Sequence, residues 1–296
     1  MSDLNSTLKS RVRAFWEANP CGVKFADVEP GSRLFYELVE AHRYTKEWHI
    51  PSAADFASAH GLRVLEIGCG LGTDGAQFAK AGADYTGVDL TEAAVQLARR
   101  RFELDGLPGQ FKTADAENLS FPDESFDLVY SHGVLHHTPD ARRAVSEINR
   151  VLRPGGRGIV MLYHRDSYNY QIGIRVLRRA GMPLLRSEAG IKLVHMLTRE
   201  PLASLREHAR ALQKNNFHFS PDELLNRSTD GAGNPLARVY SRSQARQLFK
   251  AFRQVKLRVF FLNKRFIPLI GGLLPRSIES ALASRWGWHL WIYARK

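Results

Sequence analysis

The sequence predicts an α/β protein built on a doubly wound, seven-stranded and mostly parallel sheet, and three observations lead to this prediction. Short apolar runs alternate with helical patterns through the first half of the chain. The glycine-rich segment Gly68-Cys-Gly-Leu-Gly72 follows the first apolar run and precedes a helical pattern. The last apolar runs lie far downstream, after a long stretch without strand signals. We therefore expect a C-terminal antiparallel strand to complete the sheet and a helical lid insertion to interrupt it.

The apolar runs of the first half predict five strands, at residues 63–67, 83–89, 110–113, 126–130 and 158–163. The fifth run is almost continuously apolar, as expected of a strand buried on both faces. Helical patterns follow the first, second and fourth strands, and the first of them covers residues 73–81. Thr91 is the expected N-cap of the second helix and Gly106 its end, and Pro154-Gly155-Gly156 is expected to end the third.

The second half of the chain has a different organisation. Residues 165–237 show helical patterns at 171–180 and 202–212 but no strand signal, whereas a helix at 241–252 and strands at 255–262 and 288–294 return to the sheet. The expected division therefore has four segments: an N-terminal helical cap (1–59), a ligand-binding core (60–164), a helical lid insertion (165–237) and a C-terminal completion of the sheet (238–296).

The composition excludes several classes of protein. Of the 296 residues, 44% are hydrophobic and 24% charged, which is ordinary for a globular protein and excludes a mainly disordered or fibrous one. Two cysteines, Cys21 and Cys69, are too few for a disulfide framework and lack metal-site spacing. Residues 1–20 carry no pattern of a secretory signal, and no apolar run is long enough to span a bilayer. We expect a soluble, cytoplasmic protein.

The positive charge is concentrated in the second half. The chain has a net charge of +12; residues 1–164 hold 18 Lys and Arg against 22 Asp and Glu, and residues 165–296 hold 24 against 8. The second half therefore carries +16, which suits an anionic partner such as a phosphorylated substrate, a membrane surface or nucleic acid. A solvated basic surface is the alternative.

Polar residues after successive strands predict a nucleotide-binding edge. Glycines let the backbone turn tightly and approach a ligand, and a carboxylate after the second strand can accept hydrogen bonds from ribose hydroxyls. Asp89 stands at that position, and polar residues also follow the third and fourth strands: Asp115, Ser131 and His132. The glycine spacing is GxGxG, and Thr73 stands where a dinucleotide site would have its third glycine.

The sequence resembles the class I S-adenosylmethionine-dependent methyltransferases, which have a Rossmann-like sheet. The resemblance covers roughly residues 60–164 and rests on motifs in the family's order and spacing: Val64-Leu-Glu-Ile-Gly-Cys-Gly-Leu-Gly72, Thr86-Gly-Val-Asp-Leu90, Asp115-Ala-Glu-Asn-Leu119, Phe126-Asp-Leu-Val-Tyr130, His136-His137 and Leu152-Arg-Pro-Gly-Gly156. The flanking sequence is similar to a bacterial branch that includes small-molecule, lipid and quinone methyltransferases. The resemblance implies S-adenosylmethionine as the cofactor and methyl transfer by in-line displacement as the reaction.

The resemblance also implies roles for individual residues. The three glycines would pack against the methionine moiety, Asp89 would hold the ribose, and Glu66 would support the turn. Adenine would contact Asp115 and Ala116. We expect the remaining cofactor contacts to come from the ends of the second and fourth strands and from the N-terminal segment: Leu90, Ser131, His132, Tyr36, Arg43 and Tyr44. Arg43 is expected to pair with the cofactor carboxylate. The alternative for the N-terminal segment is an amphipathic helix that caps the sheet.

A general base is needed only if the acceptor is a hydroxyl or an amine. The candidates His132, His136 and His164 each lie at or just beyond a strand end. The alternative for His136 and its neighbour His137 is that they hold the loop or the cofactor. No third ligand stands at a recognisable spacing from this pair, so no metal site is expected.

Three functions remain open at this stage. The leading one is a methyltransferase for a small or amphiphilic metabolite, which would bind under the 165–237 lid in a pocket formed by the loops at 163–170, 218–222 and 230–235. The basic helical pattern around Arg175, Arg178 and Arg179 fits association with a membrane surface or with an anionic substrate. The alternatives are an RNA methyltransferase, although no nucleic-acid-binding module is recognisable, and a non-catalytic cofactor-binding regulatory or scaffold protein.

Overall fold

The computed structural model describes residues 2–198, 200–214, 219–231, 233–263, 267 and 274–296. Residues 218 and 232, which belong to two of the expected pocket loops, lie outside the described residues. The chain divides into two compact units. The first unit contains Met1–Leu162, Arg242–Leu257 and Trp291–Lys296, and the second contains Tyr163–Ser241 and Arg258–Leu290.

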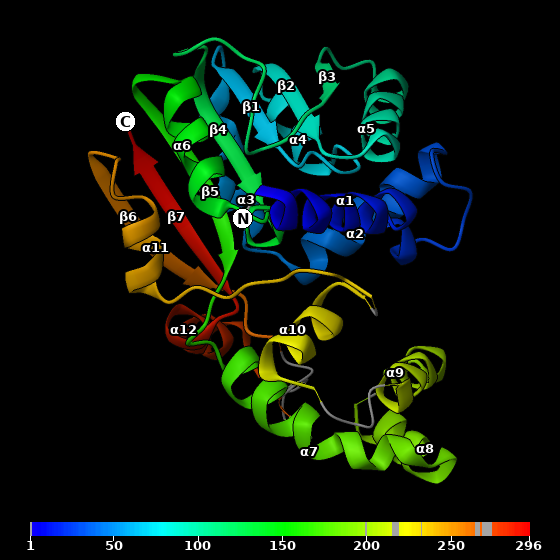
Figure 1. The fold of residues 1–296 in the computed structure, drawn as a ribbon. Coiled ribbons are helices and arrows are strands. Elements are labelled where there is room, and N and C mark those ends of the chain that lie inside the picture. The colour runs from blue at the N-terminus through cyan, green and yellow to red at the C-terminus, as the bar shows by residue number, and fades with distance from the viewer. Residues whose placement is uncertain (1, 199, 215–218, 232, 264–266, 268–273) are drawn as a thin grey trace. The chain divides into compact units, whose positions relative to one another are not determined.

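Seven strands form one sheet in the order β3-β2-β1-β4-β5-β7-β6 (Figure 1). Their bounds are β1 Arg63–Ile67, β2 Asp84–Asp89, β3 Gln110–Thr113, β4 Phe126–His132, β5 Leu152–Tyr163, β6 Gln254–Phe260 and β7 His289–Arg295. The first five strands pair in parallel. At the start of β5, Gly155 N donates to Lys296 O and Lys296 N donates to Gly156 O, which joins the last strand in antiparallel fashion. The predicted fold class is confirmed.

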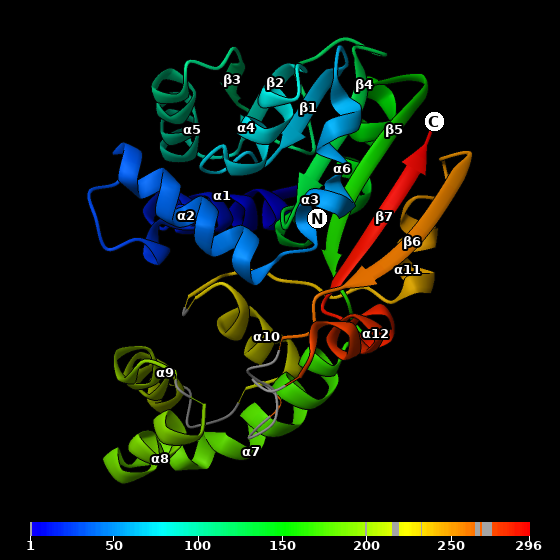
Figure 2. The same ribbon diagram turned by 180° about the vertical axis from the view of Figure 1, so that it is seen from behind.

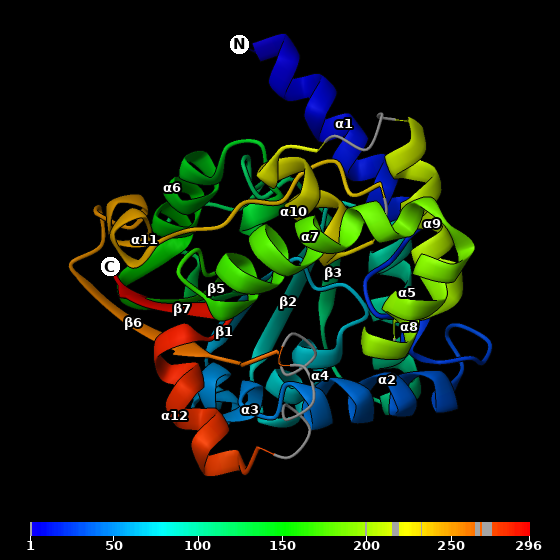
Figure 3. The ribbon, with the colours of Figure 1, turned by 90° about the horizontal axis from the view of Figure 1, so that it is seen from below.

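In the described part of the first unit, α1 Ser2–Ala18 and nine further helical segments surround the sheet. The nine are η1 Val23–Phe25, α2 Arg33–Lys46, α3 Ile50–Ala54, η2 Phe56–Ala59, α4 Thr73–Lys80, α5 Glu92–Asp105, η3 Leu135–His137, α6 Ala141–Val151 and α11 Arg242–Leu248. Figure 3 shows α6 and α11 on one side of the sheet and α3 and α4 on the other. Both faces of the central strands are therefore covered, and β4 is buried along nearly its whole length, as parallel strands in such folds are.

Helices make up most of the second unit. They are the π-helix η4 Asn169–Arg178, α7 Arg179–Gly181, η5 Met182–Arg186, α8 Glu188–Thr198, α9 Leu202–Lys214, α10 Pro221–Thr229 and α12 Arg276–Trp286. The described residues between 165 and 237 contain no strand, as the sequence predicted. Within the parts of the chain that the structure describes, no helix is both long and apolar enough to cross a membrane.

The start of α5 has the predicted N-cap residue but no capping hydrogen bond from its side chain. Thr91 occupies the N-cap position, but its hydroxyl makes no capping hydrogen bond and donates to Asp89 Oδ1 instead. The first amides of α5, those of Glu92 and Ala93, donate to the Glu17 carboxylate of α1 at 3.1 and 2.9 Å. A carboxylate suits this place because a helix N-terminus carries partial positive charge and unpaired amides. Gly106 ends α5 in the left-handed conformation, as predicted.

The end of α6 corrects a predicted boundary. The helix ends at Val151, and β5 begins at Leu152, so Pro154-Gly155-Gly156 lies inside the strand segment rather than in a separate helix stop.

Helices α1 and α2 lie across the end of the sheet toward which β1 and β4 point, as Figures 1 and 2 show from opposite sides. Side-chain contacts agree with this position, because Lys9 of α1 reaches the segment after β3 and Arg43 of α2 reaches the start of α4. The two N-terminal helices therefore cover the edge of the sheet where the polar residues gather.

Candidate cofactor site

The glycine-rich turn connects β1 to α4 through three glycines in the left-handed region. Their φ angles are 79° at Gly68, 51° at Gly70 and 70° at Gly72. A Cβ atom at Gly68 would lie 2.1 Å from a methyl of Val134, and one at Gly72 would lie 3.3 Å from Ala98. A Cβ at Gly70 would meet no atom within 4 Å. Gly68 is thus required for packing and Gly72 leaves only a tight space for a side chain, whereas Gly70 borders open space that a ligand can approach.

Asp89 connects this turn to the end of β2. Its Oδ2 accepts a hydrogen bond from Gly70 N at 3.1 Å, and its Oδ1 accepts from the amide and the hydroxyl of Thr91 at 3.0 and 2.8 Å. Burial raises the pKa of the Asp89 carboxyl, and the hydrogen bonds from Thr91 and Gly70 oppose the rise. Each carboxylate oxygen has a further lone pair, so Asp89 retains the capacity to accept from a ligand's hydroxyl groups. Leu90, the next residue, is half-buried.

Asp115 lies after β3 and is held by a residue that the sequence did not single out. Lys9 Nζ lies 2.6 Å from Asp115 Oδ2 and 2.6 Å from Glu117 Oε2. The other oxygen of Asp115 accepts from Glu117 N at 2.9 Å, and Ala116 between them is buried. Although partial burial lowers the pKa of Lys9, its hydrogen bonds to the two carboxylates raise the pKa above its usual value. The ion pair ties α1 to the expected adenine end of the site.

Arg43 of α2 and Asp74 of α4 form a buried ion pair beside the glycine-rich turn. Arg43 Nε and Nη2 donate to the two oxygens of Asp74 at 2.9 and 2.5 Å. The hydroxyls of Tyr44 and Tyr130 donate to the same carboxylate at 3.0 and 2.8 Å. Burial alone would raise the pKa of Asp74, but the charge and hydrogen bonds of Arg43 outweigh burial and hold that pKa below its usual value. Arg43 was expected to pair with the cofactor carboxylate. In the structure it pairs with the carboxylate of Asp74.

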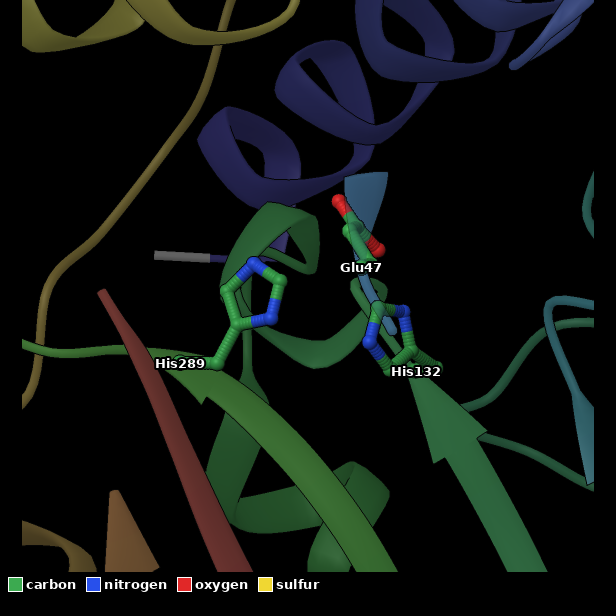
Figure 4. A group of neighbouring side chains, drawn as sticks. All are labelled: Glu47, His132 and His289. Carbon is green, nitrogen blue, oxygen red and sulfur yellow. The ribbon is translucent and has the colours of Figure 1, made fainter. Parts of the chain in front are cut away.

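Arg43 also contacts two other residues of the first unit. Its Nη1 lies 3.8 Å from Glu47 Oε2, and its Nη2 lies 3.2 Å from His132 Nδ1. Figure 4 shows the Glu47 carboxylate and the His132 ring next to each other at the end of β4; His289, also drawn there, belongs to the second unit. A guanidinium only donates, so Nδ1 of His132 accepts and its proton lies on Nε2. In this arrangement, Nδ1 is not available as a base.

Glu66 and Tyr36 are buried inside the first unit. Glu66 Oε2 accepts from the Tyr85 hydroxyl at 2.6 Å. Burial, together with the nearby Asp74 carboxylate, raises the pKa of Glu66 well above its usual value, against the effect of the Tyr85 hydrogen bond. The Tyr36 hydroxyl donates to Leu97 O of α5 at 2.6 Å. Tyr36 is thus an element of α2–α5 packing, which matches the capping helix considered as the alternative for this segment.

The remaining polar candidates lie in three different environments. Ser131 is fully buried, and its hydroxyl donates to Ile67 O at 3.0 Å, which joins the ends of β4 and β1. His136 is also fully buried, in η3, and the ring of its neighbour His137 packs edge-on against Trp16 of α1. His164 belongs to the second unit, where it is buried with Nδ1 at 3.0 Å from Gly287 O.

The structure therefore places the whole predicted cofactor set in the first unit. The members there are Tyr36, Arg43, Tyr44, Glu66, Gly68, Gly70, Gly72, Asp89, Leu90, Asp115, Ala116, Ser131 and His132. Sequence reasoning missed Lys9 and Asp74. Asp74 lies in the first turn of the helix after the glycines, and this position could have marked it as a site residue. Lys9 contacts Asp115, which lies 106 residues further along the chain, so no local sequence pattern could have marked Lys9.

Comparison with known proteins identifies the core. Residues 65–160 match a family model described as a methyltransferase domain. The chain is 45% identical over 98 residues to the phthiotriol/phenolphthiotriol dimycocerosates methyltransferase of Mycobacterium tuberculosis, a match that covers 32% of this chain and 36% of that one. It is 40% identical over 157 residues to the fatty-acid O-methyltransferase of Mycolicibacterium smegmatis, which covers 52% and 55% of the two chains. The matches thus span about a third to a half of the relatives' length.

The fold is also found in solved structures. A chain of the complex between the Haloferax volcanii Trm112 methyltransferase activator and a methyltransferase superimposes with a TM-score of 0.51 at 17% identity, covering 86% of this chain and 92% of that one. An identity this low supports the likeness of fold alone. Together with the glycine-rich turn and Asp89, the methyltransferase-domain match over the core indicates S-adenosylmethionine as the cofactor. Residues 65–160 therefore form a methyltransferase domain, within a chain that has the fold of the class I S-adenosylmethionine-dependent enzymes.

Proposed function

We propose that this chain transfers a methyl group from S-adenosylmethionine to a small or amphiphilic metabolite by in-line displacement. The observation that carries the proposal is the geometry around Gly70, whose missing Cβ borders open space while its amide contacts the carboxylate of Asp89. A ligand that has a sugar with hydroxyl groups, and a chain that lies against the protein backbone, fits such a turn. Class I methyltransferase homologues over this same core support the reaction type.

In this proposal, Gly68, Gly70 and Gly72 form the surface for the methionine moiety, and Asp89 accepts hydrogen bonds from the ribose. Asp115 and Ala116 border the adenine, with Lys9 sharing the Asp115 carboxylate. When bound, S-adenosylmethionine supplies a methyl group on a positively charged sulfur, which is already an activated electrophile. The protein's contribution is then mainly to position both reactants and to exclude water.

We infer an amphiphilic acceptor from two sources. The relatives named above are named as methyltransferases of dimycocerosates and of fatty acids, and a third, from Clavibacter sepedonicus, is a demethylmenaquinone methyltransferase with 34% identity over 143 residues. In this chain, residues 165–296 carry a net charge of +16. This charge favours an acceptor with an anionic group, bound by the helices of the 165–237 segment. We also propose that the chain acts in the cytoplasm, at a membrane surface where such acceptors are found.

The histidines have different prospects as general bases. Nδ1 of His132 accepts from Arg43, so His132 can take a proton there only after that contact opens. His136 is fully buried, which favours the role of holding the loop. His164 has one ring nitrogen at a backbone carbonyl and the other 3.8 Å from the Asp166 carboxylate. We therefore propose that proximity and water exclusion account for most of the rate enhancement. His132 would act as a general base only when its contact with Arg43 is open.

The test uses methyl-labelled S-adenosylmethionine with the full chain and fractionated cell extract. We expect label in the lipid or small-molecule fraction. Asp89→Ala should abolish both labelling and cofactor binding by calorimetry, because it removes the carboxylate from the turn. Asp84→Asn is the matched control, since Asp84 lies exposed at the opposite end of the same strand.

Two outcomes contradict the proposal. Label that enters RNA instead of lipid would favour the nucleic-acid alternative. Tight cofactor binding without any labelled acceptor, across all fractions, would favour the scaffold alternative.

A further inference from the structure

Large apolar side chains are exposed on consecutive helices of the second unit. Ile172 and Val176 of η4 are 37% and 51% exposed, and Met196 and Leu197 of α8 are 68% and 61% exposed. Single exposed apolar residues are ordinary, but large ones repeated along adjoining helices mark an interaction surface. We call these two helices and the α7–η5 segment between them, residues 169–198, the exposed helical surface; α7 and α8 are labelled in Figures 1 and 2.

The exposure on α8 follows the helical period. Gly190 and Ile191 are buried, whereas Leu193, Met196 and Leu197 are exposed. The spacing of three and four residues places these exposed side chains on one face of the helix. The inner face packs within the unit, since α8 contacts η5 and α9. The apolar outer face is therefore a second face, distinct from the one that stabilises the fold.

Basic side chains accompany these apolar ones. The basic residues of the exposed helical surface are Arg175, Arg178, Arg179, Arg186 and Lys192, and its one acidic residue is Glu188. Glu188 forms an ion pair with Arg206. Within the described part of the chain, Arg175, Arg179 and Lys192 form no salt bridge, so their charges can interact with an external anion.

We propose that the exposed helical surface docks onto an anionic lipid membrane, with Met196, Leu197 and Val176 entering the headgroup region and Arg175, Arg179 and Lys192 contacting anionic headgroups. Helices with this combination lie in the plane of a bilayer interface, where apolar burial and attraction to anionic lipid act together. The proposal gives a location to the membrane association suggested under Proposed function. It does not depend on methyl transfer, and its test measures binding alone.

Charge complementarity favours the membrane over other occupants. A second copy of the chain would bring two positively charged surfaces together, which costs electrostatic free energy. Nucleic acid would satisfy the arginines but would leave the exposed methionine and leucines without an apolar partner. An anionic bilayer satisfies both kinds of side chain.

The test is flotation of the full chain with vesicles of phosphatidylcholine alone and of phosphatidylcholine mixed with phosphatidylglycerol. We expect flotation with the mixed vesicles only, and weakening by added salt. Met196→Glu with Leu197→Glu should lower the partition coefficient by about tenfold or more, because two aliphatic side chains no longer leave water. Leu34→Glu with Leu38→Glu on α2 is the matched control, since these two leucines are 53% and 40% exposed in the first unit.

A second pair of variants isolates the charge. Arg175→Glu with Arg179→Glu should abolish the preference for phosphatidylglycerol, whereas Lys80→Glu with Arg142→Glu makes the same change of net charge on exposed residues of the first unit and should keep it. Circular dichroism and thermal unfolding verify that each variant is folded. The proposal is overturned if folded M196E/L197E floats like the wild type. It is equally overturned if sedimentation shows a dimer that this variant disrupts while neither protein floats.

Discussion

Arg43 and Asp74 form a two-pronged ion pair between helices α2 and α4, with the two donor nitrogens 2.9 and 2.5 Å from the carboxylate oxygens. The Asp74 side chain is 2% exposed and that of Arg43 is 25% exposed. The pair fastens the N-terminal helices to the element that begins at the glycine-rich turn. Its removal tests both the stability of the first unit and the proposed contact of Arg43 with the cofactor.

Arg43→Ala leaves the Asp74 charge buried with only tyrosine hydroxyls as partners. We expect a loss of about 3 kcal/mol in the free energy of unfolding by urea, at the lower end for buried pairs because Arg43 is partly exposed. Arg33→Ala on the same helix is the control, since Arg33 is 59% exposed beside Asp105 and should cost less than about 1 kcal/mol. Calorimetry on the folded variant measures cofactor affinity, and an unchanged affinity would remove Arg43 from the proposed cofactor contacts.

Gly70→Ala should separate ligand contact from folding. The left-handed φ of 51° makes alanine cost about 1–2 kcal/mol at this position, but no atom of the chain obstructs the new methyl group. If the cofactor lies against Gly70, its affinity should fall by far more than stability does. Gly106→Ala has the same kind of φ and the same open surroundings at the end of α5, and it should leave affinity unchanged. Equal affinities for the two variants would contradict the proposed site.

Gly68→Ala should act differently from Gly70→Ala. Its methyl group would lie 2.1 Å from Val134, so the turn and the loop after β4 must move apart. We expect a drop in melting temperature larger than that of Gly70→Ala, measured by calorimetric unfolding without ligand. A Gly68→Ala protein as stable as Gly70→Ala would show that this close approach is not required.

Glu66 should make stability depend on pH. Its pKa is raised in the folded protein above the value of 4.5, so the folded state holds a proton that the unfolded state releases. The resulting stabilisation is complete below about pH 4.5 and is lost as pH rises through the folded-state pKa. Glu66→Gln keeps the shape and an acceptor for Tyr85, so its free energy of unfolding should fall less with rising pH than that of the wild type. Glu103→Gln, at an exposed position, should follow the wild-type curve, and parallel curves for all three proteins would exclude this role of Glu66.

Lys9 should control how firmly α1 is held over the site. Lys9→Met removes an ion pair in which Lys9 and Asp115 are partly exposed and Glu117 is buried, so the loss of global stability should be about 1 kcal/mol. Hydrogen exchange in α1 should nevertheless become faster, because opening of one helix is a local event. Lys24→Met, at an exposed lysine after α1, should leave that exchange unchanged. Protection of α1 equal to that of the wild type would show that apolar packing alone holds the helix.

Local signals predicted much of the core. The strand at 110–113 has the predicted bounds, and the first strand and the end of α5 at Gly106 also agree. These features depend on residues close together in the sequence, namely apolar runs and a glycine that adopts a left-handed conformation. Thr91 takes the predicted N-cap position, but its hydroxyl donates to Asp89, and the first amides of α5 donate to Glu17 of another helix. The contact with Glu17 depends on tertiary structure and leaves no local signal.

The sequence by itself determined the positions of the core strands, the glycine-rich turn and the placement of Asp89 at a strand end, because each depends on short-range patterns with a fixed backbone geometry. Only the tertiary structure decided the partners of the polar side chains. Arg43 pairs with Asp74, Asp115 with Lys9, and Ser131 with the carbonyl of Ile67. The physical reason is that a buried charge or hydroxyl must find a partner, and the partner is whichever group the packed helices bring within reach.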